Sequence, residues 1–148
     1  MIVTASLTTG IVTVLRGEEA FCEFAEKLLI TPHPMWESVM SIGDQEYFAE
    51  PLTGGPVPNH QLRISVDPVA GFAALNYCDH DDDAMPLANS YNPGHPSPQV
   101  DLIFSGATGA VFPRSAAVPI EDARKALHEW FRTGLRPRCI KWRPYDQF

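Results

Sequence analysis

Residues 61–77, QLRISVDPVAGFAALNY, contain two apolar segments joined by a turn, and the predicted architecture is built around them. Asp67 and Pro68 mark the turn, and residues 70–77 follow it as a second strand. In the first segment, side chains alternate with the period of a β-strand that has one buried and one wet face. Its apolar residues are Leu62, Ile64 and Val66, and its polar ones are Gln61, Arg63 and Ser65. We therefore expect a β-hairpin within an antiparallel sheet.

Other segments with a strand-like composition lie on both sides of this hairpin. Residues 1–17 contain an apolar stretch that Thr interrupts, with no basic residue before it, and we interpret them as a strand or hairpin and not as a secretory signal. The Gly- and Pro-rich residues 53–60 and the long segment 88–99 are predicted to be connections. Strands are predicted at residues 11–15, 36–43, 46–52, 99–106 and 108–113.

Residues 17–30 and 119–134 have the 3.6-residue period of amphipathic helices. In the second of these segments, Pro119 suits the first helical position and Gly134 suits a left-handed C-terminal cap. The apolar stripes consist of Phe21, Phe24, Ala25, Leu28 and Leu29 in the first helix and of Ile120, Ala123, Leu127, Trp130 and Phe131 in the second.

After the second helix, the chain continues with a basic segment, LRPRCIKWRP, at residues 135–144. Pro137 predicts a bend, after which Ile140 and Trp142 point the same way in a short final strand with basic side chains outside. Two helices packed on an antiparallel sheet of about five to seven strands form an α+β fold. We expect residues 1–148 to form a single domain.

The composition is that of a globular protein, with 45% hydrophobic and 20% charged residues. No apolar run approaches the length of a membrane span. The three Cys residues are odd in number and form no CxxC, so neither a disulfide framework nor a cysteine zinc site is expected. Cys22 and Cys139 fall on predicted core positions. We expect a cytoplasmic protein without a cofactor.

The formal net charge of −7 is unevenly distributed. Residues 1–90 carry 3 basic and 13 acidic residues, a net of −10, and residues 91–148 carry 8 basic and 5 acidic ones, a net of +3. A strongly negative region favours a basic protein partner and repels the phosphates of nucleic acid. Acidity that serves solubility alone is the alternative.

The sharpest local feature is CDHDDDAM, residues 78–85, which directly follows a predicted strand. Asp and His are ligands of divalent ions, but adjacent loop residues rarely converge on one ion and the spacing of an EF-hand is absent. We therefore expect no metal site. Two interpretations remain open, an acidic recognition loop for a basic partner and a solvated loop between strands.

No motif in the sequence assembles a catalytic centre. The five His residues show no HExxH or other paired spacing, and no glycine cluster follows a strand and opens a helix as a nucleotide-binding loop does. A GxSxG nucleophile motif is also absent. We predict a protein that is not an enzyme. The alternatives are an interaction module of another assembly and a small ligand-binding or hydrolytic α+β domain.

Residues 118–142, VPIEDARKALHEWFRTGLRPRCIKW, resemble the closing motif of the first-numbered immunity family of bacterial polymorphic toxin systems. That family ends with a Pro-started helix, an aromatic pair, a Thr-Gly, an Arg-Pro and a Cys-x-x-Trp. YNPG at residues 91–94 and GAVFP at residues 109–113 also fit its layout, so the match covers roughly residues 88–143. We interpret the shared motif as a folding signature formed by Pro119, Leu127, Trp130, Phe131, Gly134, Pro137, Cys139 and Trp142.

The resemblance implies a small α+β protein, made beside a toxin, that binds and neutralises this toxin in the producing cell or its kin. The chain is similar to family members paired with deaminase-type toxins that act on nucleic acid. Such a toxin needs a positive cleft for phosphates, and an acidic surface can fill that cleft. The expected partner is a basic protein, with neither nucleic acid nor a membrane as a direct ligand. The predicted contact residues are Asp79, Asp81, Asp82, Asp83, Glu46 and Glu50.

Overall fold

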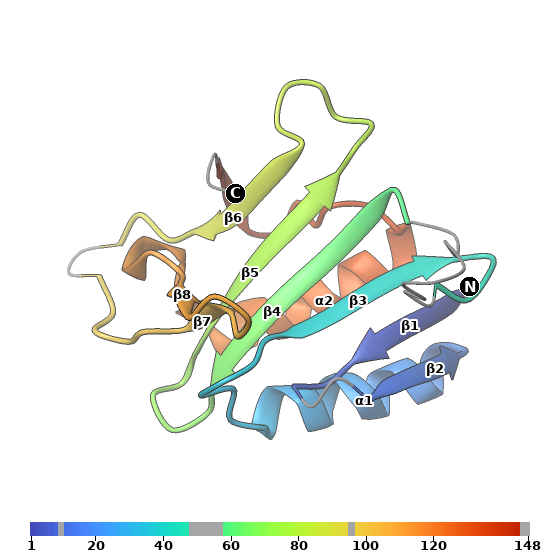
Figure 1. The fold of residues 1–148 in the computed structure, drawn as a ribbon, viewed down its shortest axis with the longest axis horizontal. Helices are drawn as coiled ribbons and strands as arrows, with labels where there is room; N and C mark the ends of the chain where they lie inside the picture. The colour runs from blue at the N-terminus through green and yellow to red at the C-terminus, as the bar shows by residue number, and fades with distance from the viewer. Residues whose placement is uncertain (9–10, 48–57, 95–96, 146–148) are drawn as a thin grey trace.

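The computed structural model describes residues 1–8, 11–47, 58–94 and 97–145. Within these ranges, two α-helices, α1 (Glu18–Ile30) and α2 (Ile120–Thr133), lie against one face of the main β-sheet (Figure 1). Neither helix combines the length and the apolar character needed to cross a bilayer.

The main sheet has eight strands among the described residues, and all their pairings are antiparallel. Seven of them follow the order β10-β6-β5-β4-β3-β1-β2, and β9 pairs with β5. The strands are β1 (Ile2–Ser6), β2 (Val12–Arg16), β3 (Ser38–Gly43), β4 (His60–Asp67), β5 (Phe72–Asp79), β6 (Leu87–Tyr91), β9 (Val118–Pro119) and β10 (Lys141–Pro144). The α+β prediction is confirmed, with eight strands in this sheet instead of five to seven.

The hairpin predicted from residues 61–77 lies at the centre of this sheet, where β4 and β5 pair over their full length. Its turn is held by the Asp67 carboxylate, which accepts the backbone N–H groups of Val69 and Ala70 over 3.1 and 3.0 Å. The N-terminal segment also forms the expected hairpin, since β1 pairs with β2. Alternation of apolar residues and a turn-forming Asp were sufficient local signals for these strands.

The core lies between the helices and the sheet. The predicted stripe of α1 is entirely buried, whereas Ile120 and Phe131 lie at the margin of the α2 stripe and are only partly buried. The ring of Phe131 stacks on that of Phe21, with centroids 4.6 Å apart. Burying each large apolar side chain contributes roughly 1.5–3 kcal/mol, and this layer holds the larger of the two hydrophobic clusters among the described residues. Its largest enclosed residues include Trp130, Tyr77, Phe21, Leu28, Leu29, Met40, Leu62, Ile64 and Leu127.

The second face of β4 is less wet than the alternating pattern predicts. A two-stranded sheet, β7 (Ile103–Ser105) and β8 (Ala110–Val111), packs over it, followed by the 3₁₀ helix η1 (Arg114–Ala116). Ser65 is therefore fully buried, and its hydroxyl donates to the carbonyl of Ile103. Alternation within one strand does not reveal which distant segment will cover its polar side.

Three further expectations are wrong. Residues 88–91 belong to β6 and not to a loop. Pro119 precedes α2 as its N-cap and pairs with Phe72 in β9, instead of occupying the first helical position. Cys139 is exposed, whereas Cys22 is partly buried. Of the strand predicted at residues 46–52, the described residues 46–47 are not in a strand, and residues 48–52 lie outside the described ranges.

The C-terminal segment turns back onto the sheet as predicted. Gly134 has a φ of 66°, and its N–H donates to the carbonyl of Trp130 over 2.7 Å, which ends α2 in a left-handed cap. Pro137 is buried at the bend, and its carbonyl accepts the indole N–H of Trp142 over 2.6 Å. Strand β10 then pairs with β6, so the tail completes one edge of the sheet.

Candidate partner-binding surface

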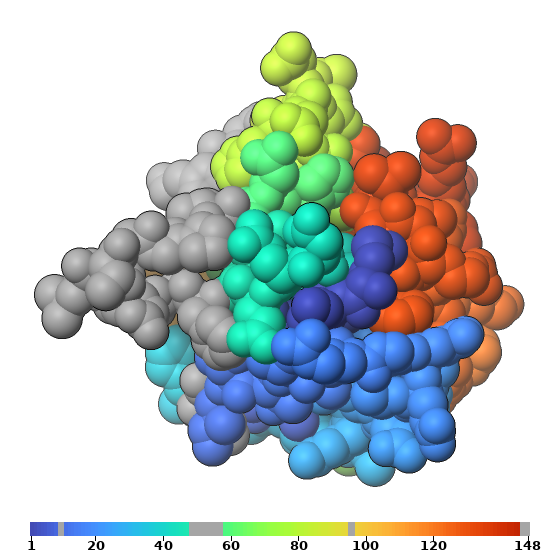
Figure 2. Space-filling model, turned by 90° about the vertical axis from the view of Figure 1, so that its right-hand side faces the viewer, coloured from blue at the N-terminus to red at the C-terminus, as the bar shows by residue number. Residues whose placement is uncertain are grey.

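The predicted contact residues that the structure describes lie at one end of the main sheet. The acidic loop, Asp79–Asp83, starts at the last residue of β5, opposite the beginning of β4, and Glu46 follows β3 at the same end. Figure 2 shows this end of the molecule, with the turn after β5 projecting at the top. The structure brings these residues to a common end without placing Glu46 in contact with the acidic loop. Glu50 lies outside the described residues.

Two carboxylates of the acidic loop hold its own backbone. Oδ1 of Asp79 accepts the N–H of Asp81 over 2.9 Å, and Oδ1 of Asp82 accepts the N–H groups of Ala84 and Met85 over 3.0 and 3.1 Å. The Met85 N–H, and then the guanidinium of Arg136, hold the pKa of the Asp82 carboxyl below its usual value. These two side chains shape the loop.

The other two carboxylates are presented to solvent. Asp83 is exposed, and the side chain of Asp81 retains 69% of its exposure. Asn59 supports Asp81 through an N–H donated to Oδ2 over 2.7 Å. A rigid turn that displays two carboxylates loses little conformational entropy when a partner binds. The exposed charge of the loop is therefore smaller than its four Asp residues suggest.

Glu46 has a cationic partner within the chain. Its carboxylate lies 2.5 Å from the guanidinium of Arg16, which ends β2, and both side chains are at least 36% exposed. A solvent-exposed pair of this kind contributes little to stability, on the order of 0–1 kcal/mol. It does, however, neutralise the charge that Glu46 would offer to a partner, so Glu46 is a weaker contact candidate than Asp81 or Asp83.

His60 joins the acidic loop from β4, a contact that spacing along the chain does not reveal. Its Nε2 lies 3.3 Å from Oδ1 of Asp79, and its Nδ1 lies 2.7 Å from the Tyr77 hydroxyl. His60, Asp79 and Asp81 place one ligand atom each within 4.8 Å of one another. Both ring nitrogens of His60 already have polar neighbours in the described structure.

The polar network continues into the core. Burial raises the pKa of the Tyr77 hydroxyl, and the nearby indole N–H of Trp130 opposes part of this rise. That N–H is fully buried and makes no hydrogen bond of regular geometry with the described residues. Tyr77 is itself inaccessible, so the His60–Tyr77 pair connects the loop to the core and does not present a nucleophile.

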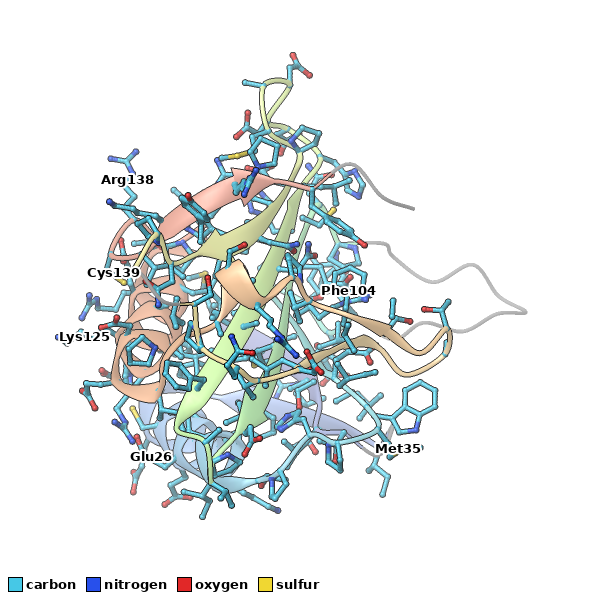
Figure 3. All side chains as sticks on the ribbon, turned by 90° about the vertical axis from the view of Figure 1, so that its left-hand side faces the viewer. Glu26, Met35, Phe104, Lys125, Arg138 and Cys139 are labelled. Carbon is cyan, nitrogen blue, oxygen red and sulfur yellow. The ribbon has the colours of Figure 1, made fainter. Side chains whose placement is uncertain are left out.

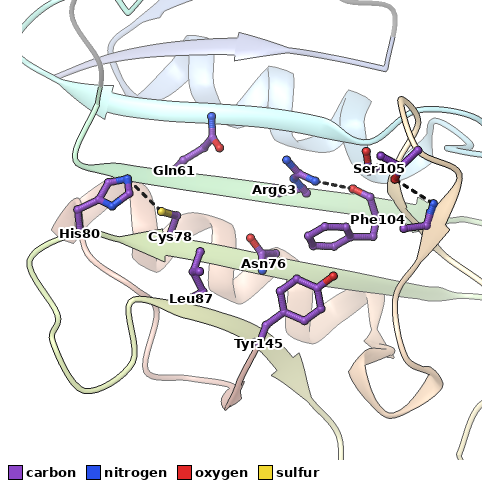
Figure 4. Close-up of a pocket in the computed structure, with 11 residues that line it drawn as sticks. Gln61, Arg63, Asn76, Cys78, His80, Leu87, Phe104, Ser105 and Tyr145 are labelled. Atoms are coloured by element: carbon purple, nitrogen blue, oxygen red, sulfur yellow. Dashed lines mark hydrogen bonds between the residues drawn. The ribbon is translucent and has the colours of Figure 1, made fainter. Parts of the chain in front are cut away.

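A groove of about 1000 Å³, here called the open-face groove, lies on the side of the sheet that the helices leave uncovered. Figure 3 places Phe104, in its wall, on the opposite side of the sheet from Lys125 of α2. In the close-up of Figure 4, His80 and Cys78 lie at one end, with Arg63 and Phe104 further along. The first end adjoins the acidic loop, because Cys78 and His80 flank Asp79.

The wall of the open-face groove is fastened to β4 and to the segment before β3. Nη1 of Arg63 donates to the carbonyl of Phe104 over 2.8 Å, and its guanidinium lies 4.5 Å above the phenyl ring. The N–H of Gly106 donates to Glu37 over 2.9 Å. A Cβ atom at Gly106 would collide with the Trp36 ring, so glycine permits this close approach.

The thiol in the open-face groove lacks the properties of a nucleophile. Sγ of Cys78 lies 3.5 Å from Nε2 of His80, a pairing that resembles a catalytic dyad in its residue types. Burial and the neighbouring Asp79 raise the pKa of the Cys78 thiol, however, and a reactive cysteine requires the opposite shift. The direction of this pKa shift argues against thiol catalysis at Cys78.

The comparison with protein families agrees with the predicted resemblance and extends it into the first half of the chain. Residues 10–144 match the family described as Immunity protein Imm1. No curated protein matches the sequence. Because the family match spans nearly the whole chain, this protein belongs to the Imm1 immunity protein family.

Proposed function

We propose that this protein neutralises a cognate toxin that acts on nucleic acid, a deaminase or a nuclease, by covering its active site. In this proposal, the contact surface is the end of the sheet that carries the acidic loop. The exposed carboxylates of Asp81 and Asp83 meet the rim of the toxin's basic cleft, while Asp79 and Asp82 keep the loop in shape. The protein acts in the cytoplasm of the producing cell and its kin.

The observation that supports the proposal is that the carboxylates of the acidic loop differ in their hydrogen bonding and exposure. Asp82 is tied to Arg136 and to two backbone N–H groups, whereas Asp81 and Asp83 face solvent. A toxin that binds phosphates must be electropositive around its active site. The net charge of −7 accelerates the encounter with such a protein, and fixed carboxylates set its orientation.

Co-expression with the product of the neighbouring gene tests neutralisation. We expect that product to stop growth alone, and we expect this protein to restore growth and to co-purify with it. A neighbouring product that is not toxic, or toxicity that persists despite co-expression, would overturn neutralisation. Co-purification without toxicity would instead support an interaction module of another assembly.

The contact surface is tested by the double variant D81N/D83N. Its matched control is E19Q/E23Q on α1, which removes the same charge from exposed positions elsewhere. We expect the loop variant to slow association with the toxin by about 3- to 10-fold at low salt, and to flatten the salt dependence, because rim charges act mainly on encounter. If the two variants had equal association rate constants with equal salt dependence, the acidic loop would not be part of the interface.

A further inference from the structure

The charge of the open-face groove is opposite in sign to the net charge of the chain. The protein has 18 acidic and 11 basic residues, yet none of the described residues that line the groove is Asp or Glu. The lining includes an Arg side chain and several neutral groups that can donate hydrogen bonds. These donors include Arg63, Gln61, Ser105 and Thr108.

Arg63 supplies the guanidinium in the open-face groove. It is half-buried, and among the described residues no carboxylate lies within ion-pair distance of it. Among the described residues, one of its five N–H donors, on Nη1, has a hydrogen-bond partner, the carbonyl of Phe104. The Phe104 ring and carbonyl stabilise this guanidinium in part. A half-buried cation without a carboxylate partner is still costly, and a guanidinium pairs most strongly with a carboxylate through two parallel hydrogen bonds.

We propose that the open-face groove receives a carboxylate-bearing segment of the toxin, with Arg63 as its anchor. The proposal rests on the proposed function, because it assigns a second contact region to the same complex. The groove begins beside the acidic loop, at Cys78 and His80, so one toxin can touch both regions. Its basic rim meets Asp81 and Asp83, and an Asp, Glu or C-terminal carboxylate enters the groove.

This alternation of charge supplies specificity that a uniformly acidic surface lacks. Any basic protein is attracted to a negative surface, but only a partner with a carboxylate at the correct distance also satisfies Arg63. Partners without that carboxylate leave a guanidinium desolvated and unpaired, which weakens their binding. The open-face groove therefore distinguishes the cognate toxin from other basic proteins.

The test compares R63Q with K125Q on the exposed outer side of α2, using the toxin from the neighbouring gene as the probe. Both variants lower the net charge by one unit, from −7 to −8. General attraction to a basic toxin predicts equal or faster association for both. Loss of the anchor predicts that R63Q alone binds about tenfold more weakly, mostly through faster dissociation. Indistinguishable affinities for R63Q and K125Q would overturn the proposal.

Because Arg63 also fastens Phe104, a second variant separates recognition from folding. Q61E keeps the side-chain shape, removes no side-chain hydrogen bond seen among the described residues and introduces a carboxylate two residues from Arg63 on the same face of β4. We expect Q61E to unfold at the wild-type temperature and to bind the toxin several-fold more weakly, by like-charge repulsion. If Q61E bound the toxin with wild-type affinity, the toxin would not enter the open-face groove, and this conclusion would not depend on the result for R63Q.

Two further measurements assign the occupant. Each Asp and Glu of the toxin is replaced in turn by its amide. We expect one of these toxin variants to bind the wild-type protein and R63Q with equal affinity, because its missing carboxylate is the partner of Arg63. A wild-type dimer that R63Q dissociates would assign the groove to a second copy of this chain and overturn the proposal. If the wild-type protein neither binds the toxin nor restores growth, the proposed function itself fails. Wild-type binding that R63Q and Q61E leave unchanged refutes only the groove.

Discussion

Nη2 of Arg136 lies 2.8 Å from Oδ2 of Asp82, and Nη1 of the same guanidinium donates to the carbonyl of Met85 over 2.9 Å. Arg136 belongs to the bend after α2, and 54 residues separate it from Asp82. The basic C-terminal segment thus holds the shape of the acidic loop. A planar guanidinium that makes two hydrogen bonds orients its partners more strongly than a single point charge does.

We expect R136Q to loosen the acidic loop. The backbone N–H groups of Ala84 and Met85 should exchange with solvent roughly tenfold faster or more, because local opening controls exchange in such a loop. Hydrogen exchange followed by NMR measures this directly. R138Q is the control, since its side chain lies two residues further on and is exposed. Equal protection in the two variants would show that Arg136 does not shape the loop.

Glu129 ties the bend after α2 to the helix. Its carboxylate oxygens accept the backbone N–H groups of Arg138 and Cys139, each over 3.0 Å. We expect E129A to lower the free energy of unfolding by about 1 kcal/mol, since two N–H groups exchange a charged acceptor for water. E129Q, which keeps one oxygen acceptor, should lose less, and urea titration measures both. A larger loss in E129Q than in E129A would contradict this role.

The same carboxylate predicts behaviour in acid. Hydrogen bonds from the Cys139 side chain and the Arg138 backbone lower the pKa of Glu129 from 4.5. A carboxyl with a lower pKa in the folded state contributes stability above its unfolded pKa and loses it as the pH falls through the folded value. The difference in stability between wild type and E129Q should therefore shrink below pH 4.5, as measured by urea unfolding across that range.

Gly134 ends α2 in the left-handed region, at a φ of 66°. A Cβ there would lie 3.7 Å from Met1 and 3.9 Å from Ile42, which is ordinary contact, so the cost of a side chain is conformational. We expect G134A to lose about 1 kcal/mol of unfolding free energy. G134N should lose less, because Asn tolerates this conformation, and urea unfolding ranks the two. The reverse order would show that packing, not backbone strain, governs the site.

His33 predicts a second dependence on pH. It is 4% exposed; its Nδ1 lies 2.7 Å from the carbonyl of Thr31, and its Nε2 lies 2.7 Å from the Ser38 hydroxyl. The carbonyl can only accept, so Nδ1 carries the proton and the neutral ring accepts from Ser38. Burial lowers the pKa of His33 from 6.5, against the opposing effects of Thr31 and Glu37.

The unfolded chain therefore binds this proton more readily, and stability should be complete above pH 6.5 and decline as the pH falls below it. H33Q should lose roughly 1–3 kcal/mol near pH 7.5, because it disrupts both hydrogen bonds. Its stability should then vary less between pH 7.5 and 5.5 than that of the wild type, and urea unfolding at several pH values measures both. Parallel curves would refute the assignment to His33.

Local patterns predicted the elements that their own residues define. The two helices have stripes whose period is visible in the sequence, and the central hairpin has a turn formed by its own Asp67. Strand β6 was not predicted, because its short segment begins a stretch rich in Pro, Gly and Asn. Its pairing with β5 on one side and β10 on the other overrides that composition.

The candidate surface was only partly predictable. The acidic loop was visible as a run of Asp residues, but the sequence did not distinguish the two carboxylates that shape it from the two that face solvent. The open-face groove was not predicted, because its residues come from separate strands and the C-terminal segment. The isolated Arg63 within an acidic half of the chain was the one sequence signal that pointed to it.

The sequence by itself determined the α+β class, the two helices, the central hairpin and the family, because each depends on neighbouring residues or on a continuous motif. Only the tertiary structure decided which charges are paired, where a groove remains on the face of the sheet opposite the helices and how the C-terminal bend meets the acidic loop. Those features arise where side chains from distant segments converge. Their free energies depend on distance and burial, neither of which is encoded in the order of residues along one segment.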